Sequence, residues 1–539
     1  MGNNILFIVP PILPLNDLKH TIESGYQHYV STSPPLGIMS MIAYYNLYVS
    51  AQSKIIDINI EIIKNNKLLL SSENYLKELM HKILSIDGYP PDIVGISAIF
   101  NSHAGYLSTI SKIIKEVWPN VIVVAGGGLP TNMYKTILSE SPEIDALLVG
   151  EGEIPFLNLI LSNDRKSFLE NSEEWVTQNN YKEKSPRPVF IQDLDEIPLL
   201  PYEMINLVDY QIKSRYHGDI NDDAIVMPLM TSRGCPYNCV FCSSYTIHGK
   251  KFRYASANRI IEDIKYLVEN YKVNTILIED DHFIYNKRRA IDILDGISEM
   301  KLNIEFTSGL VLAALDEDII QSMKKAGVRS ATLAIESGSD RVLREIIKKP
   351  LKLSMVSGVV NLLRKYEIYI RAFFIIGFPG ETIDEIYNSI NFMKETGFNW
   401  VAIMIATPIA GSRLYKICKE NNYLVSDSIE DYHYGKGNII TKDFTPAEIE
   451  KIRYNANLEV NFIDNYDLKH NKPDIAIVGF HDVIHRVQDH AFAHYFASKC
   501  YHDLGHSEKA IFHQEKYYSI INKSSVWKDH AKRFGLPLS

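Results

Sequence analysis

The sequence has few cysteines, no excess of positive charge and no apolar run long enough to cross a membrane. Five cysteines in 539 residues are too few for a disulfide framework, and a net charge of −9 provides no basic surface for nucleic acid. The first four residues lead into a short strand-like run, so we expect no signal peptide. We therefore expect a cytoplasmic protein with no integral membrane segment and no nucleic-acid partner.

The chain is too long for a single hydrophobic core, and its length predicts two to four domains. Its hydrophobic content of 46% and charged content of 22% are those of a globular protein and not of a disordered one.

Three of the five cysteines lie within eight residues, at Cys235, Cys239 and Cys242, with the spacing C-x3-C-x2-C. Thiolates at this spacing can bind one iron–sulfur cluster, and no fourth cysteine lies nearby to complete an ordinary 4Fe-4S set. Three thiolates leave one iron with an open position, as a catalytic metal requires. The alternatives are unligated thiols and a structural zinc site completed by His248, although such zinc sites usually have two separated cysteine pairs.

This arrangement resembles the radical S-adenosylmethionine enzymes, in which the open iron binds S-adenosylmethionine. The resemblance implies a 4Fe-4S cluster held by the three cysteines. It also implies an external electron donor such as flavodoxin or ferredoxin.

The first 165 residues alternate short apolar runs with amphipathic segments, which predicts a parallel sheet covered on both faces. The runs are Ile5–Val9, Ile55–Ile60, Asp92–Ile96, Val121–Val124 and Ala146–Val149. The segment between His103 and Trp118 is expected to be a helix with Leu107, Ile110 and Ile114 on one face. Five such units predict a doubly wound, Rossmann-like domain whose ligand lies beyond the carboxyl ends of the strands.

Glycine-rich and polar loops follow these strands, and glycine lets backbone amides approach a ligand closely. Taken with the cysteine motif, loops reading PPLG, GGG and GEGE resemble those of the cobalamin-binding radical S-adenosylmethionine family, over residues 1 to about 460. The resemblance implies cobalamin contacts at Pro35, Gly37, Ser97, Asn101, Gly126, Gly127, Gly128 and Glu151. The loops alone fit a generic nucleotide site equally well. No D-x-H-x-x-G motif is present, so we expect no histidine on the lower face of the corrin.

Six larger strand–helix units between Ile225 and about residue 420 are too few for an eight-fold barrel. They match the partial (βα)6 barrel of the family that the chain resembles. The residues that the resemblance implies for S-adenosylmethionine binding are Phe241, Glu279, Glu336, Gly377 and Thr407. Asp281 and Glu381 lie at the same strand ends and fit helix caps equally well. Arg371 is expected to face inward and to contact the substrate or the cofactor carboxylate.

The fold class expected is α/β, with a helical region at the end of the chain. The expected parts are a cobalamin-binding domain at 1–165, a linker at 166–222, a partial barrel at 223–425 and a mainly helical region at 426–539. Within the last part, 491–501 and 508–521 resemble one hairpin of tetratricopeptide type. Its aromatic-rich helices are expected to cover the barrel mouth. The pairs His490/His494 and His502/His506 fit either a metal site or a helix surface.

The resemblance implies a methyltransferase that acts on an unactivated carbon or a phosphinate phosphorus, through a 5′-deoxyadenosyl radical and methylcobalamin. The substrate class would be a natural product, a peptide or a lipid. Two alternatives use the same motifs: a cyclisation or rearrangement enzyme without methyl transfer, and a cobalamin-binding protein without catalysis.

Overall fold

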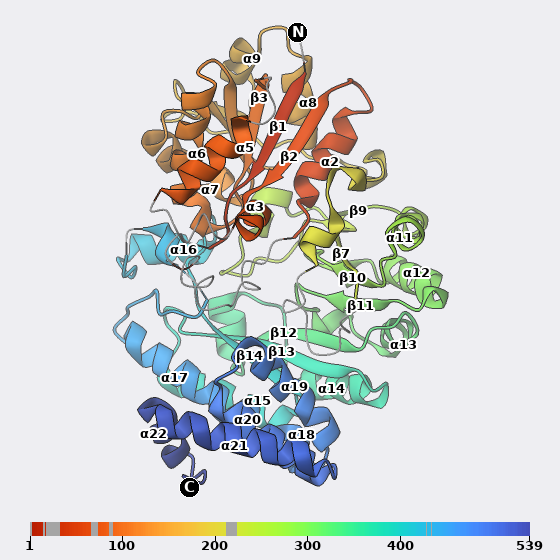
Figure 1. Ribbon diagram of the computed structural model, residues 1–539, viewed down its shortest axis with the longest axis vertical. Coiled ribbons are helices and arrows are strands. Elements are labelled where there is room, and N and C mark those ends of the chain that lie inside the picture. The colour runs from red at the N-terminus through yellow and green to blue at the C-terminus, as the bar shows by residue number, and fades with distance from the viewer. Residues whose placement is uncertain are drawn as a thin grey trace.

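The computed structural model describes residues 3–13, 17, 33–65, 74–85, 90–211, 224–426, 428–432 and 434–538. Three parts follow one another along the long axis of the molecule (Figure 1). A sheet from the first third of the chain lies at one end, the barrel strands lie in the middle, and the last helices lie at the other end.

The first sheet has the strand order β2-β1-β3-β4-β5-β6 and is parallel except where β6 pairs with β5. Its strands are β1 (Asn4–Val9), β2 (Gln52–Asp57), β3 (Ile93–Ser97), β4 (Ile122–Gly126), β5 (Ala146–Leu148) and β6 (Trp175–Thr177). The doubly wound order confirms the expected Rossmann-like fold. The second strand ends earlier than its apolar run predicted, because the Asp57 carboxylate accepts the Asn59 N–H and starts a helix at Ile58.

Helices cover both faces of this sheet, as continuous apolar strands require. They are α2 (Leu36–Tyr45), α3 (Ile58–Lys64), α5 (Tyr75–Ser85), α6 (Ala104–Val117), α7 (Gly128–Glu140), α8 (Glu153–Leu161) and α9 (Arg165–Asn171). Buried side chains of α2 and α8 join the core of one face, and those of α5 and α6 join the core of the other. Leu107, Ile110 and Ile114 of α6 are buried, as their spacing predicted.

The segment expected to be a linker is packed where the structure describes it. It contains α9 and β6, and Leu194, Ile197 and Tyr202 are buried in a core that is continuous with the barrel. Residues 212–222 of that expected linker lie outside the described residues.

The barrel has six parallel strands in two three-stranded sheets, ordered β7-β10-β11 and β12-β13-β14. They are β7 (Val226–Leu229), β10 (Thr275–Ile278), β11 (Asn303–Phe306), β12 (Ser330–Glu336), β13 (Tyr369–Ile376) and β14 (Trp400–Ile405). Parallel bridges from Ile304 to Val328 and from Leu310 to Leu333 connect the two sheets. The expected partial barrel is therefore confirmed.

The barrel helices are α10 (Ser244–His248), α11 (Ala257–Tyr271), α12 (Lys287–Ile297), α13 (Glu317–Lys325), α14 (Val356–Lys365), α15 (Ile383–Thr396) and α16 (Arg413–Glu420). A short antiparallel pair, β8 (Ser232–Arg233) with β9 (Arg253–Tyr254), encloses the cysteine motif.

Six helices end the chain: α17 (Pro446–Leu458), α18 (Tyr466–Lys469), α19 (Pro473–Arg486), α20 (Ala491–Asp503), α21 (Ser507–Lys523) and α22 (Ser525–Arg533). Helices α20 and α21 form the expected hairpin, and α17 begins at a capping box of Thr445 and Glu448. No helix of the described residues is long and apolar enough to span a bilayer.

The first of these helices, α17, borders the barrel mouth, because its Ile449 would lie 3.1 Å from a Cβ built on Gly377. The later helices lie elsewhere, contrary to the expectation that they cover the mouth. Trp400, the first residue of β14, packs against Phe462 and Phe480, and Gly479 of α19 lies against its ring. The aromatic side chains thus draw the helices to the amino ends of the strands. Figure 1 places them at the end of the molecule opposite the first sheet.

Candidate functional site

The three cysteines lie on the loop between β8 and α10, and two aspartates at the end of β10 hold this loop in place. The Asp280 carboxylate is buried and accepts hydrogen bonds from the Thr231 N–H and hydroxyl and from the Ser232 hydroxyl, at 2.5–2.6 Å. The Asp281 carboxylate accepts the Gly234 N–H at 3.1 Å. Gly234 has a φ of +87° and lies against the Lys251 carbonyl, where a side chain has no room. The loop conformation is therefore fixed by carboxylates of the neighbouring strand.

Neither carboxylate that fitted a helix cap serves as one. Asp281 binds the cysteine loop, and fully buried Glu381 accepts the N–H groups of Gly377 and Phe378 at 2.7 and 3.1 Å. Thr382 caps α15 instead. Burial raises the pKa of Glu381 to about 8.

The thiols of the three cysteines are free and half-buried. Burial raises the pKa of Cys235 and Cys239 to about 11 and also raises that of Cys242. The thiols are close enough to influence one another electrostatically, and the positive charge of Lys349 partly offsets the effect of burial on Cys239. Three soft donors on one loop fit an iron–sulfur cluster with an open iron.

Within the described ranges, no three His, Cys, Asp or Glu side chains already surround a common point at metal-binding distance. His248, the fourth ligand of the zinc alternative, instead contacts Glu151 through its Nδ1 at 3.0 Å. The other two cysteines, Cys418 and Cys500, are fully buried elsewhere.

Glu336 forms a buried ion pair with Lys349 across the barrel mouth. The Lys349 Nζ lies 2.9 Å from Glu336 Oε1, and both side chains are less than a tenth exposed. Glu336 has a φ of +74° and follows a bulge at Ala334, a strained conformation for a residue with a side chain. Such strain persists only when neighbouring contacts hold it, and the Lys349 ammonium is one of these. Sequence reasoning missed Lys349 because no motif marks it.

The other residues implied for S-adenosylmethionine binding also lie at the carboxyl ends of the strands. Glu279 follows β10, Gly377 follows β13 with a φ of +86°, and Thr407 follows β14 and is buried. Phe241 lies on the cysteine loop, with its ring centre 6.3 Å from that of Phe378. Parallel strands bring these ends to one edge, so the structure groups them with the cysteines.

Arg371 does not lie at that edge, contrary to expectation. It is the third residue of β13 and pairs in register with Trp400, at the amino end of the barrel. Its Nη1 lies 3.5 Å from the Asp482 carboxylate of α19, and its guanidinium lies over the Tyr369 ring. Gly377 is six residues further along, about 20 Å away at the rise of a strand. The α19 carboxylate thus provides the partner that a buried arginine requires.

The loops after β3 and β4 form the edge of the first sheet that faces the barrel. Gly127 has a φ of +108°, and a Cβ there would lie 2.6 Å from the Ala98 carbonyl oxygen. Ile99 and Phe100 expose about half of their side-chain surfaces. His103 is buried, and its Nδ1 accepts the Ile99 N–H, so it braces the loop from within. Burial lowers the pKa of His103 to about 4. The edge thus presents backbone and apolar groups but no imidazole from this loop, which fits a corrin held without histidine.

The remaining residues implied for cobalamin lie along the same edge. Ser97 is the last residue of β3 and pairs in register with Gly126 of β4. Pro35 and Gly37 lie at the start of α2, and no heavy atom lies within 4 Å of a Cβ built on Gly37. Asn101 begins the turn before α6.

This edge is in direct contact with the barrel. A Cβ on Gly128 would lie 3.1 Å from the Ile247 Cδ1 of α10, the helix that follows the cysteines. The Asn132 side-chain amide donates to the Thr246 hydroxyl at 3.0 Å. The GGG loop and the cysteine loop therefore belong to one site between the two parts.

Glu151 lies in a buried set of ion pairs and hydrogen bonds, which we call the clasp: Ser40, Glu151, Glu153, Arg233, His248 and Arg253. Arg253 binds both Glu151 carboxylate oxygens, at 2.6 and 2.8 Å. Arg233 lies 3.3 Å from Glu151 and 2.7 Å from Glu153. Both arginines belong to the β8–β9 pair, and Arg233 immediately precedes Gly234 and Cys235. The clasp therefore joins the first sheet to the cysteine loop.

The clasp changes the expected role of Glu151. Burial alone would raise the pKa of Glu151, but hydrogen bonds from Arg253 and His248 and the charge of Arg233 lower it to about 2. Its carboxylate is thus ionised and occupied by barrel side chains and does not face a cofactor. Sequence reasoning missed Arg233 and Arg253 because their carboxylate partners are about 80 and 100 residues away in the chain.

Residues 423–440 form a second connection, which we call the strap. Its two limbs are held together by hydrogen bonds from Val425 N–H to Asn438 and from Ile440 N–H to Tyr423. Ile429 and Tyr432 are buried with side chains of the first sheet's helices. The Tyr434 carbonyl accepts the Ile405 N–H at 2.9 Å, at the end of β14. The strap thus passes from the barrel mouth to the first sheet.

The histidines of the last helices have three different environments. His490 caps α20 by accepting the Ala493 N–H, and His494 is buried with its Nδ1 2.9 Å from that of His513. His502 and His506 are exposed, as the helix-surface interpretation predicted. The part of the chain that the structure describes contains no metal-ligand group among them.

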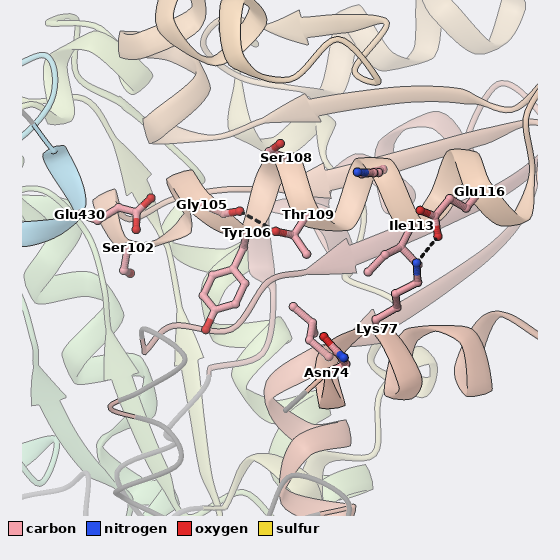
Figure 2. Close-up of a pocket in the computed structure, with 12 residues that line it drawn as sticks. Asn74, Lys77, Ser102, Gly105, Tyr106, Ser108, Thr109, Ile113, Glu116 and Glu430 are labelled. Carbon is pink, nitrogen blue, oxygen red and sulfur yellow. Dashed lines mark hydrogen bonds and ion pairs between the residues drawn. The ribbon is translucent and has the colours of Figure 1, made fainter. Parts of the chain in front are cut away.

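A cleft of about 610 Å³ lies on the outer face of α5 and α6 (Figure 2). Lys77 and Glu116 form an ion pair at its rim, and Glu430 of the strap lies at its other end beside Gly105. None of the residues implied for cofactor binding lines this cleft. Because those residues lie between the first sheet and the barrel, that interface is the candidate site.

Comparison with known proteins gives two family matches. Residues 50–160 match the B12 binding domain, and residues 229–393 match the Radical SAM superfamily. An uncharacterized methyltransferase of Pyrococcus horikoshii is 33% identical over 83% of this chain and 90% of its own length. The cytidylyl-2-hydroxyethylphosphonate methyltransferase of Streptomyces wedmorensis is 28% identical over 72% of this chain and 78% of its own.

One solved structure has the same fold over nearly the whole chain. It is the radical S-adenosylmethionine methyltransferase TsrM of Kitasatospora setae, with cobalamin and a 4Fe-4S cluster bound. The TM-score is 0.60 at 14% identity, and the match covers 96% of this chain and all of the other.

Proposed function

Because the chain belongs to the cobalamin-binding radical S-adenosylmethionine family, we propose that it methylates an unactivated carbon or a phosphinate phosphorus of a natural-product, peptide or lipid substrate. Its cofactors are a 4Fe-4S cluster, S-adenosylmethionine and cobalamin. When bound, these groups supply the electron, the radical and the methyl group, and the protein binds, orients and shields them. The contact between α10 and the GGG loop supports the proposal best, because it brings the cysteine loop and the glycine-rich loop together.

We propose Cys235, Cys239 and Cys242 as the cluster ligands. Asp280 and Asp281 hold the loop through Thr231, Ser232 and Gly234, so they are positioning residues for it. The donor of electrons would be an external one-electron carrier such as flavodoxin or ferredoxin. Free thiols and such a cluster both require a reducing compartment, which favours a cytoplasmic location.

Glu336 and Lys349 are proposed to bind the methionine part of S-adenosylmethionine. The amino-acid end of that molecule is a zwitterion, and an ion pair of opposite charges can receive it without leaving an uncompensated charge. Their burial beside the cysteine loop makes each contact stronger than in water. Glu279, Phe241, Gly377 and Thr407 complete the proposed site at the same edge.

The proposed cobalamin site comprises Pro35, Gly37, Ser97, Asn101 and the Gly126–Gly128 loop. Exposed Ile99 and Phe100 would provide an apolar surface there. Glu151 is left out as a side-chain contact because the clasp occupies its carboxylate.

Valine in place of Gly127 is expected to abolish cobalamin binding while leaving the cysteine loop intact. The residue needs a left-handed φ and lies against the Ala98 carbonyl, so a β-branched side chain would displace the loop. Cobalamin retained after gel filtration, measured by its visible absorbance, should fall at least tenfold. Gly358→Ala is the matched control, because a Cβ there meets nothing and Gly358 is exposed on α14, outside the proposed cobalamin site. Equal cobalamin retention in both variants would contradict the proposed site.

The strap runs past the carboxyl end of β14, beside the proposed site. Burial raises the pKa of Tyr434, and the nearby charge of Cys242 adds to that effect, so its phenol lies beside the cysteine loop. Tyr434 is nevertheless about half exposed. We propose that Tyr434 contacts the substrate and helps to exclude water from the radical.

Product analysis tests the reaction class. Anaerobic incubation with S-adenosylmethionine, cobalamin, reductant and a candidate substrate pool should yield both S-adenosylhomocysteine and 5′-deoxyadenosine, together with a product heavier by one methylene unit. A converted substrate without S-adenosylhomocysteine would indicate cyclisation or rearrangement. Stoichiometric zinc with no iron–sulfur absorbance and no cleavage of S-adenosylmethionine would contradict the enzyme altogether.

A further inference from the structure

Four cationic side chains surround the outer edge of the cysteine loop, which we call the basic rim: Lys250, Lys251, Lys348 and Arg413. They come from three separate segments, namely the turn after α10, the loop after β12 and the start of α16. All four are exposed. The protein as a whole is acidic, with 65 aspartates and glutamates against 56 lysines and arginines. A local excess of positive charge at this position therefore differs from the surface as a whole.

Each rim residue lies close to the cysteine loop, because its side chain or the backbone of its segment contacts that loop. Lys250 Nζ donates to the Asn238 side-chain carbonyl at 2.6 Å, and Arg413 Nη2 reaches the same oxygen at 3.4 Å. Asn238 is the exposed residue immediately before Cys239. The Lys251 carbonyl lies against Gly234, immediately before Cys235.

Backbone hydrogen bonds secure the remaining segments. Val240 donates its N–H to the Ile347 carbonyl at 2.9 Å, and Lys348 is the next residue. The Val240 carbonyl in turn accepts the Leu414 N–H at 2.8 Å, next to Arg413. In the described part of the chain, none of the four cations forms an ion pair with a carboxylate. Their charges are therefore available to another molecule.

We propose that the basic rim is the docking surface for a small acidic one-electron carrier protein. The inference rests on the proposed function, because it assumes that the cysteines hold a cluster. In the step, one electron passes from the reduced carrier to the oxidised cluster, so the carrier is oxidised by one electron and the cluster is reduced by one. No bond forms or breaks and no proton moves. Asn238 lies at the centre of the rim, where the cluster loop is nearest to solvent.

Electrostatic attraction would act mainly on the rate of encounter, which complementary charges raise by 10- to 1,000-fold at low salt. The effect should weaken as salt rises, because the Debye length falls to about 8 Å at 0.15 M. A small anionic reductant such as dithionite needs no extended surface and should be much less sensitive to the rim.

The test compares two ways of reducing the same holoenzyme. In the double variant Lys250→Glu/Arg413→Glu, cleavage of S-adenosylmethionine driven by flavodoxin, its reductase and NADPH should fall at least tenfold at low salt. Cleavage driven by dithionite should stay within about twofold of the unmodified protein. The matched control is Lys528→Glu/Lys532→Glu on α22, which changes the net charge equally at the far end of the molecule (Figure 1) and should alter neither rate.

Direct titration of flavodoxin onto the reconstituted protein separates this inference from the proposed function, since binding needs no turnover. A salt-dependent affinity that is lost in the rim variant and kept in the α22 control supports the docking surface. Unchanged affinity, or an equal loss of both the flavodoxin-driven and the dithionite-driven rate, overturns it. If the double variant does not fold, Lys348→Glu replaces it, because the Lys348 side chain makes no hydrogen bond in the described structure. The outcomes that support or overturn the docking surface are then the same.

Discussion

Alanine at Cys235, Cys239 or Cys242 is expected to reduce the iron content of anaerobically reconstituted protein from about four atoms per chain to none. Cleavage of S-adenosylmethionine should fall to the level seen without protein, because the loop offers no other thiol to replace the missing one. Iron and sulfide analysis, together with 5′-deoxyadenosine measured by chromatography, checks both results.

Cys418→Ala and Cys500→Ala are the matched controls. Both thiols are fully buried, and burial raises the pKa of each to about 12, so neither is exposed as a metal ligand. Each control should keep its cluster, although loss of a buried side chain lowers stability somewhat. A cluster that survives in the three loop variants and disappears in a control would refute the assignment.

Methionine in place of Arg253 should lower the free energy of unfolding by about 3–5 kcal/mol, because it leaves the buried Glu151 carboxylate without its bidentate partner. Lys64→Met is the control, since its ion pair with Asp209 is exposed and should contribute less than about 1 kcal/mol. Urea titration checks both values. An equal effect of the two variants would mean that the clasp contributes no more than a surface pair.

The clasp also predicts a specific dependence on pH. The folded pKa of Glu151, about 2, lies below its ordinary value of 4.5, so ionisation stabilises the fold above pH 4.5. This contribution of about 3 kcal/mol should be lost as the pH falls from 4.5 towards 2. Glu151→Gln cannot titrate, so the difference in stability between the unmodified protein and this variant should shrink over that range. A constant difference would contradict the low pKa.

Much of the fold could be predicted from the sequence because local patterns determine it. Apolar runs such as Ile5–Val9 and Val121–Val124 alternate with amphipathic segments, which is typical of a covered parallel sheet, and six larger units predict a partial barrel. The cysteine spacing likewise indicated the proposed cluster loop, since the three candidate ligands lie within eight residues. Glu279, Glu336, Gly377 and Thr407 were assigned by resemblance, and their grouping at one edge follows from parallel strands.

Only the tertiary structure decided which side chains meet across the interface. Glu151 looked like a cofactor contact, but Arg233 and Arg253 occupy its carboxylate from distant parts of the chain. Arg371 looked like a contact to the substrate or the cofactor carboxylate, but its level along β13 and the position of Asp482 place it at the other end of the barrel. Long-range ion pairs leave no periodic pattern in a sequence, because each partner needs only the right charge once the folded backbone has brought it near. For the same reason the sequence by itself indicated the chemistry that we propose for the cysteine loop, whereas packing determined the clasp, the strap and the basic rim around it.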